Sequence, residues 1–210
     1  MVQPAHTHGD GRPGTGSFHF GFGWPYADSG LFFPRYTFEN RLTAYGGVGG
    51  IPQYLQYLSQ EDNLLAGLGR SYFRPTGHLF EEPSSLLKQE LREPATYNSI
   101  IAAIASGASR MNEIAARTGE DGKKCAKYLK TMLDLHILKR ETPIGAKGER
   151  SSLYLVSDNT LRFWYRFVAE SISNIQAGMG DIVMARQVLP AISDYMGRVF
   201  EDVCMQYMMR

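Results

Sequence analysis

The chain has 210 residues, 43% of them hydrophobic, and its 22 Lys/Arg nearly balance its 21 Asp/Glu to give a net charge of +1. This length and apolar content predict one or two globular domains, and the near-neutral total leaves any argument for nucleic-acid binding to local charge. Cys125 and Cys204 are too few and too far apart for a disulfide framework, which favours a reducing compartment. The longest apolar run, Ile100 to Ala105, is too short to span a bilayer, and no secretory signal begins the chain. Composition therefore predicts a soluble, cytoplasmic protein without a membrane segment.

Residues 1–30 are rich in Gly, His, Pro and Thr and lack apolar periodicity, so we expect them to be disordered. His6, His8 and His19 include an H-x-H spacing that can ligate a metal, but a tail without fixed geometry predicts only incidental binding and no metal site. The stretch Gly11 to Ser17 has some of the glycine spacing of a phosphate-binding loop. It places a serine where that loop needs lysine, so we predict no nucleotide site there.

Residues 31–93 predict a small helical subdomain, because short apolar segments alternate with glycine-rich joints. Cap residues, prolines and glycines set the predicted helix limits. The first expected helix runs from a Thr37 cap through Tyr45 and is followed by a break at Gly46–Gly50, and the second runs from Pro52 to Leu58. The third begins at an Asp62 cap, is interrupted at Gly67 and Gly69, and ends at Pro75. The fourth runs from Ser84 to Leu91.

Residues 94–157 predict three helices followed by a β-hairpin, which is the element order of a winged helix-turn-helix. In the second helix we expect Met111, Ile114 and Ala115 to point inward. The predicted elements are helices Asn98–Ser106, Arg110–Thr118 and an Asp121-capped helix to Leu135, then strands Leu138–Thr142 and Leu153–Val156 around the turn-rich residues 143–148.

Residues 158–210 predict further helices: an Asp158-capped helix Thr160–Ala169, then Ile182–Val188 and Pro190–Met209 after breaks at Gly178 and Gly180. Phe163, Trp164 and Phe167 could stack on bases, but their helical spacing favours a place in the core. The last helix carries a long apolar stripe, for which we expect self-association or a protein partner. The stripe comprises Ile192, Tyr195, Met196, Val199, Phe200, Val203, Tyr207 and Met208.

Basic residues gather on the third helix of the winged-helix segment. Ala95 to Ser157 contains ten Lys/Arg and six Asp/Glu, a local charge of +4. On the third helix Cys125, Leu129, Met132 and Leu133 share one face, and lysines share the other. The predicted DNA-binding residues are Lys123, Lys124, Lys127 and Lys130 on this helix, with Lys147 and Arg150 at the hairpin tip.

Such a face suits the phosphate backbone of duplex DNA, whereas few Arg, Asn or Gln residues are present on the helix to recognise base edges. The pattern therefore predicts binding with low sequence specificity. Two alternatives stay open: the lysines form a solvated helix face, or they meet an acidic protein partner.

Several stretches of the chain resemble a known family. They are Phe32–Glu39, Gly49–Leu55, Leu79–Pro83, Gln89–Pro94, Lys127–Met132, Ser157–Asn159 with Arg162–Phe167, and Tyr195–Gly197 with Phe200–Glu201. Together they resemble the C-terminal part of the archaeal-type AAA ATPases. The resemblance implies a helical lid, a winged helix and the start of a nuclease-like domain of the PD-(D/E)XK type.

This resemblance implies ATP and Mg²⁺ as cofactors of the full-length family, but the P-loop would lie upstream of residue 1. The nuclease-like domain needs an Asp and a Glu-x-Lys on paired strands after its first helix, and only Glu201 on that helix is present. We therefore expect Glu201 to be an ordinary solvated residue and this chain to contain no catalytic, cofactor or metal site.

The sequence thus predicts a mainly α protein with a helical lid-like subdomain (31–93), a winged helix (94–157) and a helical stub of a nuclease-like domain (158–210). Its predicted function is non-catalytic binding of duplex DNA by a fragment of an archaeal-type AAA ATPase. The alternative is a protein-interaction or oligomerisation module.

Overall fold

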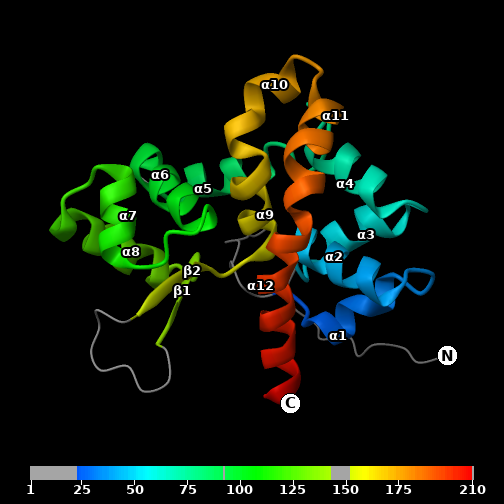
Figure 1. Ribbon diagram of the computed structural model, residues 1–210, viewed down its shortest axis with the longest axis horizontal. Helices are drawn as coiled ribbons and strands as arrows, with labels where there is room; N and C mark the ends of the chain where they lie inside the picture. The colour runs from blue at the N-terminus through cyan, green and yellow to red at the C-terminus, as the bar shows by residue number, and fades with distance from the viewer. Residues whose placement is uncertain (1–22, 92, 143–151, 210) are drawn as a thin grey trace, which may run out of the picture.

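The computed structural model describes residues 23–91, 93–142 and 152–209. Over these residues the protein is mainly α-helical with a two-stranded antiparallel sheet, which confirms the predicted fold class (Figure 1). The α-helices are α1 Tyr26–Ser29, α2 Phe38–Val48, α3 Pro52–Ser59, α4 Leu64–Tyr72, α5 Glu82–Glu90, α6 Pro94–Ala105, α7 Met111–Thr118, α8 Gly122–Asp134, α9 Asn159–Phe167, α10 Ile172–Gln176, α11 Gly180–Val183 and α12 Leu189–Met208. Short 3-10 helices span Gly30–Phe32 and Ala169–Ser171, a π-helical segment spans Met184–Val188, and the strands are β1 Leu138–Glu141 and β2 Leu153–Val156.

The expected disorder through residue 30 is wrong from residue 23 onward. Tyr26, at the start of α1, is only 5% exposed, and its ring contacts those of Tyr45 and Tyr207 edge-on. Aromatic rings bury much apolar area per residue, so a single one can anchor a segment that lacks periodicity. The residues predicted from the tail, His6, His8, His19 and the stretch Gly11 to Ser17, lie outside the described residues.

Glycines in α2 pack against neighbouring helices instead of breaking the chain, which corrects the predicted helix end at Tyr45. Thr37 caps the helix as predicted by accepting a hydrogen bond from the Asn40 backbone N–H (3.3 Å). The helix then continues through Gly46 and Gly47 to Val48, and only Gly49, with φ +64°, ends it. A Cβ at Gly46 would lie 2.7 Å from Met196 Sδ on α12, so the missing side chain is what permits the close approach.

The same correction applies to α4, which runs through Gly67 and Gly69 without interruption and ends at Tyr72, before the expected Pro75. Its cap is Asn63, whose side chain accepts from the Ala66 N–H (3.0 Å), and not the predicted Asp62. Of the two glycines, Gly67 lies on the face of α4 that packs against the chain, and Gly69 lies where there is open space. A Cβ on Gly67 would crowd Glu61 and Leu58, whereas one on Gly69 would meet nothing within 4 Å.

Three helices and the hairpin follow in the predicted order, with α6, α7 and α8 gathered on one side of the molecule beside the sheet (Figure 1). The strands pair antiparallel, with Leu138 opposite Val156 and Glu141 opposite Leu153. Ile114 is fully buried at the centre of α7, but Met111 is 40% exposed, so its expected inward position is wrong. Met111 is the first residue of α7, and this end of the helix is not buried in the core.

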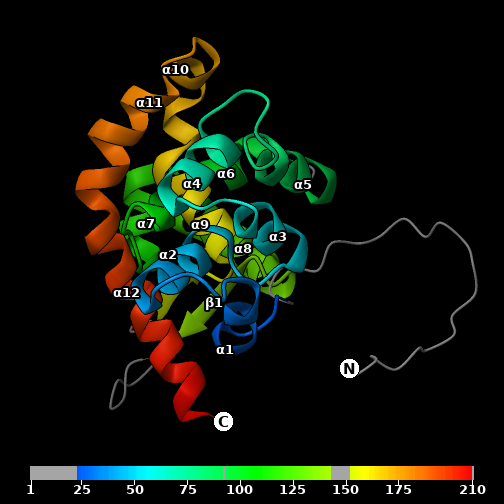
Figure 2. The same ribbon diagram turned by 90° about the vertical axis from the view of Figure 1, so that its right-hand side faces the viewer.

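The C-terminal helices join the rest of the chain in one core. The predicted helices Ile182–Val188 and Pro190–Met209 are not separate, because helical structure continues from α11 through the π-helical segment into α12 (Figure 2). Pro190 comes just after the π-helical segment, where the hydrogen-bond pattern of the helix already departs from the α-helical one. The Tyr195 hydroxyl donates to the Gly46 carbonyl (2.7 Å), and the Trp164 indole donates to the Phe80 carbonyl (2.7 Å). No helix among the described residues is long and apolar enough to cross a membrane.

Candidate functional site

Helix α8 separates its apolar and basic residues onto opposite faces. Asp121 caps it by accepting hydrogen bonds from the backbone N–H groups of Lys123 and Lys124. The buried face consists of Cys125, Tyr128, Leu129 and Met132. Lys123, Lys127 and Lys130 are exposed, and none forms an ion pair with another described residue. Their ammonium groups are therefore available to an anionic partner.

The other predicted DNA-binding residues differ from these three. The Lys124 ammonium pairs with Glu120 (3.0 Å) and lies 5.7 Å from the centre of the Tyr128 ring, so its charge is already partly neutralised. The same Glu120 hydrogen bond raises the pKa of Lys124. Lys147 and Arg150 lie outside the described residues. The structure thus leaves Lys123, Lys127 and Lys130 as the basic face.

Cys125 lies in the core beneath this face and is fully buried. Burial raises the pKa of its thiol, and Glu120 adds to the effect. The neighbouring lysines therefore do not activate it, and a structural role agrees with its predicted place in the core. Phe163, Trp164 and Phe167 are likewise buried, so they are core residues as expected and cannot stack on bases.

A cluster of charged residues joins the hairpin to the C-terminal helices. Asp202 on α12 accepts hydrogen bonds from Lys139 on β1 and from Arg162 on α9, both at 2.9 Å. Arg162 also donates to the Val156 carbonyl on β2 (3.0 Å). Arg198, one turn before Asp202, pairs with Glu141 on β1 (2.7 Å). Both strands are thereby held against α9 and α12. Sequence reasoning did not find this cluster, because its members lie far apart in the chain.

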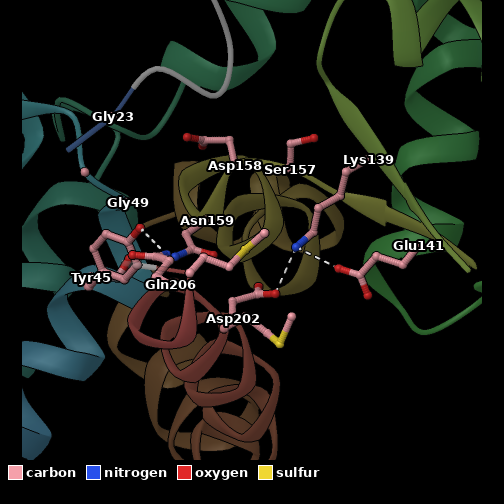
Figure 3. Close-up of a pocket in the computed structure, with 13 residues that line it drawn as sticks. Gly23, Tyr45, Gly49, Lys139, Glu141, Ser157, Asp158, Asn159, Asp202 and Gln206 are labelled. Atoms are coloured by element: carbon pink, nitrogen blue, oxygen red, sulfur yellow. Dashed lines mark hydrogen bonds and ion pairs between the residues drawn. The ribbon is translucent and has the colours of Figure 1, made fainter. Parts of the chain in front are cut away.

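Lys139, Glu141 and Asp202 of this cluster also border a pocket of about 420 Å³ between α2, β1 and α12 (Figure 3). At its centre the Lys139 ammonium lies between Asp202 and Glu141, at 2.9 and 3.0 Å. Burial alone would raise the pKa of Asp202, but Arg162 and Lys139 lower it overall. The charges of Lys139, Glu141 and Asp202 thus satisfy one another, and these ion pairs hold β1 against α12.

Asp158, at the edge of the same pocket, is the N-cap of α9 and accepts a hydrogen bond from the Leu161 N–H (3.0 Å). Burial raises the pKa of this carboxyl group, outweighing the hydrogen bonds from Leu161 and Thr160 that lower it. No other described residue forms an ion pair with Asp158. Its role in capping was predicted, whereas its partial burial was not.

The apolar stripe on α12 divides into two parts. Tyr195, Val199 and Val203 are buried against the chain's own core, which corrects the expectation that the whole stripe lacks a partner. Phe200, Tyr207 and Met208 remain 47%, 55% and 73% exposed. Glu201 is exposed and pairs with Arg198 (3.0 Å), as expected of a solvated residue. Among the described residues no group of His, Cys, Asp or Glu could hold a metal ion.

Residues 164–210, from within α9 through α12, match the family model DUF234, described as "Archaea bacterial proteins of unknown function". The chain is also similar to "Uncharacterized protein MJECL04" of Methanocaldococcus jannaschii, with 30% identity over 178 residues. This alignment covers 84% of the chain and 39% of the relative, so the chain spans less than half of that relative's length. No solved structure matches.

The comparisons therefore relate the chain to archaeal and bacterial proteins of unknown function. Neither of them names an AAA ATPase, and the resemblance to that family remains a prediction.

Proposed function

We propose that the chain binds duplex DNA through the exposed face of α8, with low sequence specificity. The observation that carries this proposal is the row Lys123, Lys127 and Lys130, exposed and without ion pairs to other described residues. A basic helix preceded by two helices and followed by a hairpin is the arrangement that winged helix-turn-helix domains present to the major groove.

The chemistry of the face favours phosphates over bases. Lysine ammonium groups act as mobile point charges, whereas arginine and amide side chains make the bidentate contacts that distinguish base pairs. The outward face of α8 presents lysines, and its opposite face is occupied by core residues. We therefore expect affinity to come from counterion release and to fall steeply with salt.

The test is fluorescence anisotropy of a labelled duplex with the full chain at several salt concentrations. One variant replaces Lys123, Lys127 and Lys130 with Gln. If each lysine neutralises one phosphate, the negative slope of log affinity against log salt should become shallower by about 2.7. Two unrelated duplexes should bind with similar affinity.

The matched control replaces Arg35, Lys88 and Arg186 with Gln. These residues are exposed and lie outside α6–α8 and the hairpin, so the net charge changes equally while the α8 face stays intact. Equal losses in the two variants would mean that only total charge matters, and an unchanged affinity in the α8 variant would refute the proposal.

We further propose that the chain corresponds to the lid, winged helix and first nuclease-like helix of an archaeal-type AAA ATPase. The motifs that support this lie in α2–α3, in the α5–α6 connection, in α8–α9 and in α12. ATP hydrolysis would then belong to a separate module, so the chain by itself should show no ATPase activity and no retention on an ATP resin. ATP hydrolysis by the purified chain, or its retention on the ATP resin, would contradict this assignment.

Self-association is a second candidate, favoured by the exposed apolar residues Phe200, Tyr207 and Met208 on α12. Removing α12 would not test it cleanly, because Tyr195 and Val199 belong to the core. A variant with Phe200→Ser and Met208→Ser leaves that core intact. Multi-angle light scattering should show an oligomer for the wild type and a monomer for the variant; a monomeric wild type rejects this candidate.

A further inference from the structure

A second cavity, of about 250 Å³, lies between the C-terminal end of α6, strand β2, α9 and α12. It is separate from the exposed lysine face of α8. Its polar lining is dominated by three arginines, Arg162 and Arg166 on α9 and Arg198 on α12. Among the described residues that line it, Asp194 is the one acidic side chain. Asp202 and Glu141, from outside the lining, pair with Arg162 and Arg198, so Arg166 is the arginine of the lining whose charge no ion pair among the described residues offsets.

Two of these arginines have hydrogen-bond donors that no described residue satisfies. Arg162 is 8% exposed, and its Nη2 atom contacts both Asp202 and the Val156 carbonyl, yet its Nη1 atom is buried without a partner among the described residues. Arg198 pairs through its terminal nitrogens with Glu141 and Glu201, while its Nε atom is likewise buried without a described partner. Buried donors left without acceptors are costly, so a group that supplies oxygen atoms would stabilise this region.

Arg166 supplies the third guanidinium group. It is exposed, forms no ion pair with another described residue, and lies over the Phe167 ring with 5.5 Å between the guanidinium carbon and the ring centre. Contact with the aromatic ring restricts the side chain without neutralising it. The cavity thus combines Arg166, which is restrained but forms no ion pair with another described residue, with Arg162 and Arg198. Each of these two has one hydrogen-bond donor without a described partner.

We propose that this cavity binds a phosphate group. Guanidinium groups match phosphate oxygens in pairs of parallel hydrogen bonds, and three guanidinium groups around one cavity suit the four oxygens of a phosphate better than the two of a carboxylate. The phosphate is either free in solution or part of a nucleic-acid backbone. The site does not depend on the α8 face, so each can fail without the other.

The test is isothermal titration calorimetry of the full chain with inorganic phosphate, with acetate and chloride as comparisons at equal ionic strength and pH. We expect phosphate to bind more tightly than acetate. Arg166→Gln should weaken phosphate binding about tenfold, as expected for the loss of a charge-assisted hydrogen bond. Asp194→Asn should strengthen it several-fold, because it removes the repelling carboxylate.

Arg186→Gln is the matched control, since Arg186 is exposed on the π-helical segment and does not line the cavity. It should leave phosphate binding unchanged. Equal heats for phosphate and acetate, or equal losses in Arg166→Gln and Arg186→Gln, would overturn the site. The opposite responses of Arg166→Gln and Asp194→Asn cannot both arise from a folding defect.

Titrating a duplex oligonucleotide into the same variants identifies the source of the phosphate. A loss of DNA affinity in Arg166→Gln, alongside its loss of phosphate binding, assigns the site to the nucleic-acid backbone. Unchanged DNA affinity, with phosphate binding still reduced, assigns it to a free phosphate or a small phosphorylated molecule.

Discussion

Asp202 on α12 binds the ammonium group of Lys139 on β1 at 2.9 Å, across 63 residues of sequence. Through this contact the last helix determines where the hairpin lies. Because Arg162 connects the same carboxylate to the Val156 carbonyl on β2, both strands of the hairpin depend on one acidic side chain. If the hairpin helps to bind DNA, α12 belongs to the binding unit even though it is remote in sequence.

Replacing Asp202 with Asn should destabilise the protein by about 3 kcal/mol, because it leaves the largely buried Arg162 without its counter-charge and Lys139 with Glu141 alone. Urea unfolding followed by circular dichroism measures the change. The neighbouring Glu201→Gln is the control: Glu201 forms an exposed pair with Arg198, and such pairs contribute at most about 1 kcal/mol. Similar losses in both variants would contradict the central role of Asp202.

The stability of the wild type should decrease in acid, in part through Asp202. Its folded pKa is lowered overall by Arg162 and Lys139, below the value of about 3.9 typical of an unfolded aspartate. The resulting stabilisation is complete above that unfolded pKa and is lost as the pH falls through the folded pKa. Unfolding free energies measured between neutral pH and strong acid should depend less on pH in Asp202→Asn. Parallel curves for the two proteins would argue against this origin.

Asp158 should behave in the opposite way, because burial raises its folded pKa above the unfolded value. Its ionised form then opposes folding, with the penalty absent below the unfolded pKa and complete above the folded pKa. Asp158→Asn keeps a side-chain oxygen for the Leu161 N–H and removes the charge, so its melting temperature at pH 7 should rise. Asp158→Ala loses the cap and should cost about 1 kcal/mol. Equal destabilisation by Asn and Ala would exclude a charge penalty.

Two helical glycines should respond oppositely to alanine. A Cβ at Gly46 would lie 2.7 Å from Met196 Sδ and 3.1 Å from a Val199 methyl carbon, so Gly46→Ala should cost about 1–3 kcal/mol by overpacking. At Gly69, within α4, a Cβ would meet no atom within 4 Å. Gly69→Ala should therefore raise the free energy of unfolding by about 0.5–1 kcal/mol, because alanine reduces the backbone freedom of the unfolded chain. Thermal unfolding of both variants tests this contrast, and a stabilised Gly46→Ala would show that α12 packs less closely on α2.

The candidate DNA-binding face was predictable because it depends on local periodicity. Cys125, Leu129 and Met132 recur at helical spacing, so the lysines between them had to face away. The pairing of Lys124 with Glu120, just before the N-cap of α8, joins residues four apart and could have been anticipated from that spacing. The phosphate cavity and the Asp202 cluster could not, since their residues meet only when the hairpin, α9 and α12 pack together.

The amino-acid order alone determined the succession of helices and strands, their caps at Thr37, Asp121 and Asp158, and the outward lysines of α8, because caps and periodicity act within a few residues. Tertiary packing decided that Gly46 continues a helix where it was expected to end one, since only the approach of α12 shows why a side chain is missing there. It also decided which charges are neutralised and which remain free. Ion pairs between distant residues depend on three-dimensional proximity, and local sequence patterns carry no record of it.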